Sequence, residues 1–172
     1  MSATLNLASI YSRGLDGIEE NVQLAIKYTE MAGNLGHSPS LIHLSRYYKK
    51  GKGVEMDLEK HFELYRHSAE LGNCAANRYL VNAYLLGRDR EIDVDKAIVY
   101  AQKLKLLGEN NSLLKIAVTL IYGEKIEKDE ERGLEILVNL GESGSVTAFK
   151  YLGDYYDDEG KRNFSFFFIN IN

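Results

Sequence analysis

The chain has 172 residues, of which 45% are hydrophobic and 27% are charged, and its formal net charge is −4. This composition is typical of a folded protein and excludes disorder over most of the length. The acidic excess argues against nucleic-acid binding, which requires a basic stripe for phosphate contacts. The single cysteine cannot form an internal disulfide.

Apolar residues at helical spacing predict nine helices joined by short turns. In the first helix, Leu7, Ile10 and Tyr11 contribute to an apolar face that ends before Gly14. Pro39 lies in the first turn of the third helix, where its missing N–H group costs nothing. In chain order the predicted helices cover residues 4–13, 21–35, 38–50, 57–71, 74–86, 93–107, 110–122, 129–143 and 146–157.

The signals that start and stop these helices recur along the chain. Asn21 precedes the second helix, and an aspartate takes the same position later, where its oxygen can accept a hydrogen bond from a free N–H of the first turn. Glycine ends the same helices because the chain leaves them in a left-handed conformation that a Cβ opposes. The recurring residues are Asp57, Asp93 and Asp129, and Gly36, Gly72, Gly108 and Gly144.

An apolar stripe follows each of these glycines and repeats with the same period of 36 residues. Its first member is small, which lets two helices approach closely, and its later members are large. A fixed period of this length indicates a solenoid in which each repeat packs only on its neighbours. The stripe consists of Ser40, Ala76, Ser112 and Ala148; Leu44, Leu80, Ile116 and Leu152; and Tyr48, Tyr84, Leu120 and Tyr156.

The turn after Tyr48 reads Gly51-Lys52-Gly53-Val54-Glu55-Met56-Asp57, and Ala69-Glu70-Leu71-Gly72 closes the same repeat. This pattern resembles the Sel-one-like repeat (SLR), a relative of the tetratricopeptide repeat with a longer first turn. The resemblance runs from about residue 4 to residue 157 and is strongest over 37–72. It implies an all-α fold, a right-handed α/α superhelical solenoid of antiparallel helix pairs.

In the phase of this family, residues 1–160 form the solenoid. Its repeats are 3–36, 37–72, 73–108 and 109–144, and a lone capping helix follows at 146–157. The later repeats depart from the pattern, and we expect a looser register there. Arg90 stands where other turns have Ile18, Val54 or Ile126, His61 and Gly133 replace a small alanine, and Leu120 replaces a tyrosine.

The resemblance implies a bacterial, non-enzymatic interaction module. We expect an adaptor or scaffold that binds a partner protein or a peptide on its concave face, without a cofactor. One alternative is an immunity or inhibitor protein that occludes a cognate toxin or enzyme, for which the acidic C-terminal end would suit a basic nuclease or lipase. A regulatory subunit that tethers an enzyme is a further alternative.

If the first helix of each repeat lines the concave face, as in related repeats, the residues opposite the apolar stripe are candidates for partner binding. The face is then basic in its first half and acidic at its end, and this favours a partner with a defined orientation. The alternative is a solvated helix surface. The candidates are Arg46, Lys49, Lys50, Arg78, Tyr79, Asn82, Lys115, Lys150 and Asp154, with Leu114, Val118 and Tyr151 at related positions and Asp157, Asp158 and Glu159 extending the acidic end.

The sequence contains no pattern that favours catalysis or metal binding. His61 and His67 are six residues apart on one helix and therefore point to opposite sides, so they do not form a metal-binding pair. Cys74 is expected to be a small buried thiol at a helix start. Gly51-Lys52-Gly53 lacks the strand that precedes a phosphate-binding loop. We therefore expect neither an enzyme nor a metal site.

Residues 161–172 form a low-complexity apolar tail rich in phenylalanine and isoleucine. It is interpreted as a truncated or divergent end, with a cover over the last helix or an anchor for a partner as alternatives. The N-terminus has no pattern of a signal peptide. No apolar run reaches the ~20 residues needed to span a bilayer. The expected location is the cytoplasm.

Overall fold

A computed structural model describes residues 2–15, 17–123 and 125–158, which form nine α-helices and no strand. The predicted all-α fold is confirmed, and every predicted helix boundary agrees with the structure to within two residues. The helices are α1 (Ser2–Arg13), α2 (Val22–Asn34), α3 (Ser38–Lys50), α4 (Leu58–Glu70), α5 (Cys74–Leu86), α6 (Val94–Leu106), α7 (Asn111–Tyr122), α8 (Glu130–Glu142) and α9 (Val146–Asp158).

The even-numbered helices begin at side-chain caps. The Asp57 carboxylate accepts a hydrogen bond from the backbone N–H of Lys60 at 2.8 Å, and Asn21, Asp93 and Asp129 cap α2, α6 and α8 in the same way. The glycine after each of these helices adopts a left-handed conformation, as at Gly72, where φ is +80°. These turns therefore form from local sequence signals alone.

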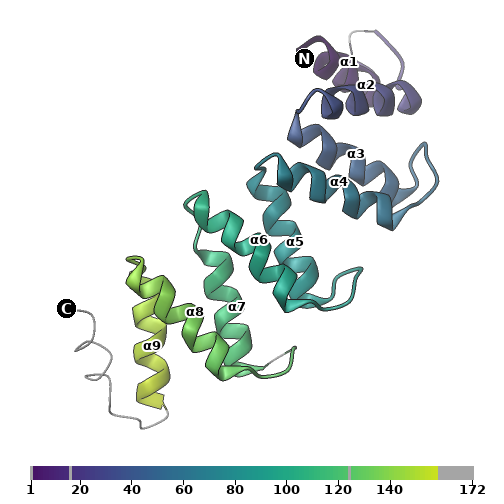
Figure 1. Cartoon of the computed structure of the whole chain (residues 1–172). Coiled ribbons are helices and arrows are strands. Elements are labelled where there is room, and N and C mark those ends of the chain that lie inside the picture. Colours follow the sequence, from purple (N-terminus) through teal and green to yellow (C-terminus); the bar gives the residue numbers. More distant parts are fainter. Residues whose placement is uncertain (1, 16, 124, 159–172) are drawn as a thin grey trace.

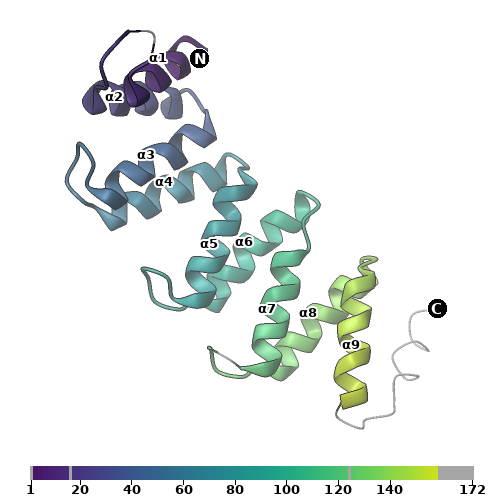
Figure 2. The ribbon, with the colours of Figure 1, turned by 180° about the vertical axis from the view of Figure 1, so that it is seen from behind.

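The helices pack as sequential antiparallel pairs, α1 with α2, α3 with α4, α5 with α6 and α7 with α8, and α9 packs on α8. The pairs follow one another in a row, with α1 and α9 at opposite ends (Figure 1). The view from behind shows the pairs in the same order. The turns that join α3 to α4 and α5 to α6 lie along one edge of the molecule (Figure 2). Each repeat therefore contacts only its neighbours, as expected for a solenoid.

The core is a strip formed by the repeated stripe. Ala76 and Leu80 in α5 and Ile116 in α7 are fully buried. The buried residues fall into two clusters, a large one from α3 to α9 and a small one that consists of Ile26, Leu41, Leu44 and Leu64. Helix α1 contributes no buried residue to either cluster. The hydrophobic stabilisation is therefore concentrated in the middle of the solenoid.

Two departures from the repeat pattern are accommodated by specific contacts. The guanidinium of Arg90 lies 4.3 Å from the centroid of the Phe62 ring and forms an ion pair with Glu59. The guanidinium of Arg90 thus packs on Phe62 in the turn where an isoleucine or valine stands elsewhere. At Gly133, a Cβ would lie 2.8 Å from the carbonyl oxygen of Ala117, so only glycine allows this close approach of α7 and α8.

Cys74 is exposed, and the prediction of a buried thiol is wrong. It is the first residue of α5, and the buried residues of that helix begin only at Ala76. The apolar tail at residues 161–172 lies outside the described residues, as do Glu159 and the side chain of Asp158. None of the helices in the described ranges is both long and apolar enough to cross a membrane.

Candidate functional site

Two hollows lie between consecutive odd-numbered helices. The first, of about 390 Å³, lies between α1 and α3 and has Thr29 of α2 in its wall; it is lined mainly by small and hydroxyl-bearing side chains together with two histidines. The second, of about 320 Å³, lies between α5 and α7. We call the surface that α1, α3, α5 and α7 present around these hollows the odd-helix face. The first hollow is lined by Leu5, Ala8, Ser9, Ser12, Arg13, Thr29, His37, Pro39, Ser40, His43 and Tyr47, and the second by Arg78, Val81, Asn82, Glu109, Asn111, Ser112 and Lys115.

The two hollows occur at equivalent positions of the repeat. His43 lines the first, and Lys115, two periods later, lines the second. Both sit on the wall where one odd-numbered helix faces the next. The hollows are thus a consequence of the solenoid geometry, and their chemistry is set by the residues that vary between repeats.

Three candidate residues come together at the second hollow. The Nζ of Lys115 donates a hydrogen bond to Oδ1 of Asn82 at 2.5 Å, and Nδ2 of Asn82 donates to the backbone carbonyl of Arg78 at 2.9 Å. Lys115 therefore reaches from α7 to α5 across the hollow. Arg46, one period before Asn82, is exposed on α3 beside the first hollow.

The remaining candidates are spread along the chain. Lys50 is exposed at the end of α3, and Lys150 and Asp154 are exposed on α9. Leu114 is buried in the core, as is Ile42 at the equivalent position of α3, so Leu114 is not available to a partner. The structure does not gather all candidates into one cluster.

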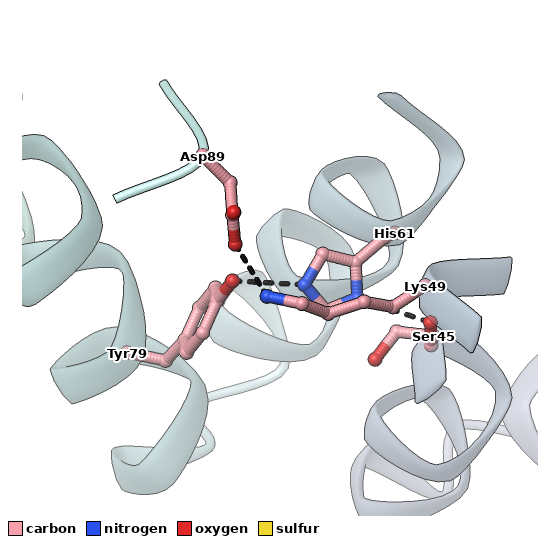
Figure 3. A network of polar contacts seen from close by, with 5 residues as sticks. All are labelled: Ser45, Lys49, His61, Tyr79 and Asp89. Atoms are coloured by element: carbon pink, nitrogen blue, oxygen red, sulfur yellow. Dashed lines mark hydrogen bonds and ion pairs between the residues drawn. The ribbon is translucent and has the colours of Figure 1, made fainter. Parts of the chain in front are cut away.

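Tyr79 and Lys49 belong to a polar network between α3, α4 and α5 (Figure 3). The hydroxyl of Tyr79 lies 2.8 Å from Nε2 of His61, and Nδ1 of His61 lies 3.0 Å from the backbone carbonyl of Ser45. The ring of Tyr79 also stacks on that of Tyr65, with centroids 3.8 Å apart. Lys49 forms an ion pair with Asp89, in the turn after α5.

The protonation of His61 follows from its surroundings. Its side chain is 1% exposed, and this burial lowers the pKa of His61, opposed by the hydrogen bond to Ser45. The neutral ring donates from Nδ1 to the Ser45 carbonyl and accepts at Nε2 from the Tyr79 hydroxyl. Burial also raises the pKa of Tyr79, which keeps its hydroxyl protonated as a donor. Tyr79 is thus held inward by His61.

This network does not follow from the repeat pattern of the sequence. Its one signal is His61, which stands where the first and third repeats have Ala25 and Ala97. A histidine in place of a buried alanine requires polar partners, because an unpaired ring nitrogen is costly to bury. The partner, Tyr79, comes from the next repeat and is visible only in the folded chain.

Two titratable groups at the hollows, Lys115 and His43, have lowered pKa values, mainly because of burial. The pKa of Lys115 is lowered by burial and then by the nearby charges of Arg88 and Lys125. Burial, then Arg46, then His37 lower the pKa of His43. Basic side chains therefore lie near both hollows, Arg88 and Lys125 near Lys115 and Arg46 near His43. Within residues 2–15, 17–123 and 125–158, no group of three acidic, histidine or cysteine side chains is arranged to hold a metal ion.

The sequence model of the Sel1 repeat family matches three segments of this chain, residues 2–37, 38–73 and 76–109. Together these segments cover more than half of the chain. The chain belongs to the Sel1 repeat family. The resemblance identified from the sequence is confirmed. The matches contain α1 to α4, most of α5, and α6, and the pair α7 and α8 continues the same antiparallel pairing beyond them.

Solved structures of Sel1 repeat proteins have the same fold. A Sel1 repeat protein from Oxalobacter formigenes superposes with a TM-score of 0.57 at 25% identity, over 90% of this chain and 63% of that one. A protective antigen of uropathogenic Escherichia coli with an SLR fold also gives a TM-score of 0.57, at 26% identity, over 91% of this chain and 34% of the antigen.

Two curated relatives are similar over a shorter segment. Cytochrome c oxidase assembly factor 7 of Xenopus tropicalis is 37% identical over 59 residues, and assembly factor 7A of Xenopus laevis is 33% identical over 70 residues. These segments represent 34% and 41% of this chain and 26% and 30% of the relatives. The chain therefore spans less than a third of the curated relatives it matches.

Proposed function

We propose that this Sel1 repeat chain is a non-enzymatic interaction module that binds a partner protein, or a peptide of one, on the odd-helix face. Repeats of this family generally mediate protein interactions, and a repeat-only domain presents a long surface for this purpose. In this proposal the chain acts as an adaptor or scaffold for its partner.

The recurrence of hollows between odd-numbered helices is the observation that carries this proposal. A hollow of about 320–390 Å³ can hold one or two side chains of a partner, and two of them on one face allow attachment at two points. Around the second hollow, Arg78, Asn82 and Lys115 provide polar groups for orientation. The two curated relatives are named as assembly factors of cytochrome c oxidase, which is compatible with an interaction role.

The test is to identify a partner and then to break the interaction on the odd-helix face. The tagged full chain is used to capture proteins from an extract, and each captured protein is identified by mass spectrometry, purified and bound again in isolation. The double variant Arg46→Glu, Arg78→Glu reverses two exposed charges on α3 and α5. We expect it to weaken binding at least about tenfold, since attraction turns into repulsion at two positions.

A matched control makes the same change in net charge elsewhere. Lys27 on α2 and Lys105 on α6 belong to even-numbered helices, and the variant Lys27→Glu, Lys105→Glu should bind as the wild type does. Circular dichroism confirms that both variants are folded. Equal affinity of the wild type and the Arg46→Glu, Arg78→Glu variant for every purified partner would show that binding takes place on another surface.

A further inference from the structure

Acidic side chains are absent from one of the two sets of helices, whereas basic side chains occur in both. Helices α1, α3, α5 and α7 contain no aspartate or glutamate, although the chain as a whole has a net charge of −4. The acidic residues of the helices up to α8 lie on the even-numbered ones. The charged residues of the four odd-numbered helices are Arg13, Arg46, Lys49, Lys50, Arg78 and Lys115, and the acidic residues of the even-numbered helices are Glu30, Glu59, Glu63, Glu70, Asp95, Glu130, Glu131, Glu135 and Glu142.

Burial alone does not explain this separation. Both sets of helices bury one side and expose the other, and an exposed position tolerates either sign of charge. Arg46, Arg78 and Lys115 are exposed, and an acidic residue at any of these positions would have been accommodated by the fold. The exclusion of carboxylates from four successive odd-numbered helices therefore points to a surface that has to remain positive.

The acidic groups that do approach this face are already paired. Asp89 forms an ion pair with Lys49. Glu109 lines the second hollow, but its two carboxylate oxygens accept hydrogen bonds from the backbone N–H of Ser112 at 3.0 Å and from its hydroxyl at 2.9 Å. Among the described residues, no ion pair joins this carboxylate to Arg78 or Lys115, which line the same hollow.

We propose that the partner of the odd-helix face is an acidic, extended peptide segment that lies across α1, α3, α5 and α7 and places side chains into the two hollows. This inference rests on the proposed function and specifies the ligand class. The carboxylates of the segment contact Arg13 and Arg46 at the first hollow and Arg78 and Lys115 at the second.

A peptide fits this surface better than a nucleic acid. Each of the helices α1, α3, α5 and α7 carries only one to three basic residues. A nucleic acid, in contrast, carries a negative charge at every phosphate. The exposed carboxylates of Asp154 and Asp157 on α9 repel a uniform polyanion that continues along the solenoid. The first hollow is lined partly by alanine, leucine, serine and tyrosine side chains, and the second by valine, asparagine and serine beside its charged residues, which suits the mixed chemistry of a peptide.

The experiment selects ligands without assuming a sequence. A random 16-residue peptide display library is panned on the immobilised full chain, and the enriched peptides are sequenced and compared with the naive library. We expect at least a twofold excess of aspartate and glutamate. The best peptide is then synthesised with a fluorescent label, together with a version in which every Asp is Asn and every Glu is Gln, and both are titrated with the wild-type protein.

The expected results are a loss of affinity of at least tenfold for the amide version and a similar loss for the Arg46→Glu, Arg78→Glu variant. The Lys27→Glu, Lys105→Glu control should bind within twofold of the wild type. The amide peptide uses only the wild-type protein, so this arm remains decisive even if a variant does not fold.

Three results would contradict the inference in distinguishable ways. The absence of any enriched peptide would overturn the extended peptide ligand, whereas the proposed function itself would be contradicted by equal affinity of the wild type and the Arg46→Glu, Arg78→Glu variant for every purified partner. Enriched peptides without an acidic excess, or with equal affinity as amides, would leave the interaction function in place and overturn the acidic ligand. Tighter binding of a labelled 20-nucleotide single-stranded RNA than of the acidic peptide, lost in the Arg46→Glu, Arg78→Glu variant, would assign the face to nucleic acid instead.

Discussion

His61 is the residue whose environment differs most from the repeat pattern. Its imidazole replaces a buried alanine, and it is accommodated because Ser45 and Tyr79 each provide a hydrogen-bond partner. The pair links α4 to α5 and so joins the second repeat to the third. A buried polar contact of this kind fixes one relative arrangement of two helices, since other arrangements leave ring nitrogens unpaired.

The pKa of His61 leads to a prediction about stability and pH. In the unfolded chain a histidine has its ordinary pKa of about 6.5, whereas burial lowers the pKa of His61 in the folded chain. Between these two values the unfolded state binds more protons, so the free energy of unfolding falls as the pH drops below about 6.5. Urea unfolding at about pH 7.5 and about pH 5.5 measures this loss.

The variant His61→Ala should lose less stability between these two pH values than the wild type, because alanine does not titrate. The pKa of His43 is also lowered, but this group is present in both proteins and cancels in the comparison. His67→Ala, at an exposed position of the same helix, serves as the control and should behave as the wild type does. An identical loss in His61→Ala and the wild type would contradict the assignment of this pH dependence to His61.

At the scale of single elements, the even-numbered helices depend on their caps. Each begins with an asparagine or aspartate whose oxygen accepts a hydrogen bond from an N–H of the first turn, and each is followed by a glycine with positive φ. These signals are local, and for this reason the helix boundaries could be predicted so closely.

Removal of one cap should therefore have a defined cost. In Asp57→Ala the N–H of Lys60 loses its acceptor at the start of α4, and we expect the free energy of unfolding to fall by about 1 kcal/mol. Asp57→Asn keeps an oxygen at this position and should remain within a few tenths of a kcal/mol of the wild type. Denaturant unfolding of the three proteins tests this, and equal stability of the alanine variant would show that solvent satisfies the first turn equally well.

At the scale of the whole molecule, stability is distributed unevenly. Helix α5 buries seven residues, Ala76, Asn77, Leu80, Val81, Ala83, Tyr84 and Leu85, whereas α1 buries none. In a solenoid each repeat is held only by its neighbours, so the end with little buried surface opens first.

Native-state hydrogen exchange measures this distribution directly. The amides of α1 should exchange at least about tenfold faster than those of α5, since fewer apolar contacts oppose the opening of the end helix. Helix α7, which also belongs to the large buried cluster, should be protected to a degree similar to α5. Uniform protection along the chain would indicate that the solenoid opens as one cooperative unit.

Parts of the candidate site could be predicted from the sequence, and parts could not. The period placed Arg78, Asn82 and Lys115 on one side of the odd-numbered helices, and the structure brings these three together at one hollow. Tyr79 lies on the same helices but turns inward to His61, and Cys74 is exposed where burial was expected. The inward position of Tyr79 depends on His61, a side chain of another helix. The exposure of Cys74 depends on how the chain enters α5.

The sequence by itself determined the repeat, the family, the helices and their caps, because these follow from spacing, from short-range hydrogen bonds and from backbone preferences at glycine. Only the tertiary structure decided which exposed residues meet across helices. The contact of Lys115 with Asn82, the pairing of Lys49 with Asp89 and the two hollows on the odd-helix face all join residues from different repeats. Their distances depend on how neighbouring helices pack, which no local pattern specifies.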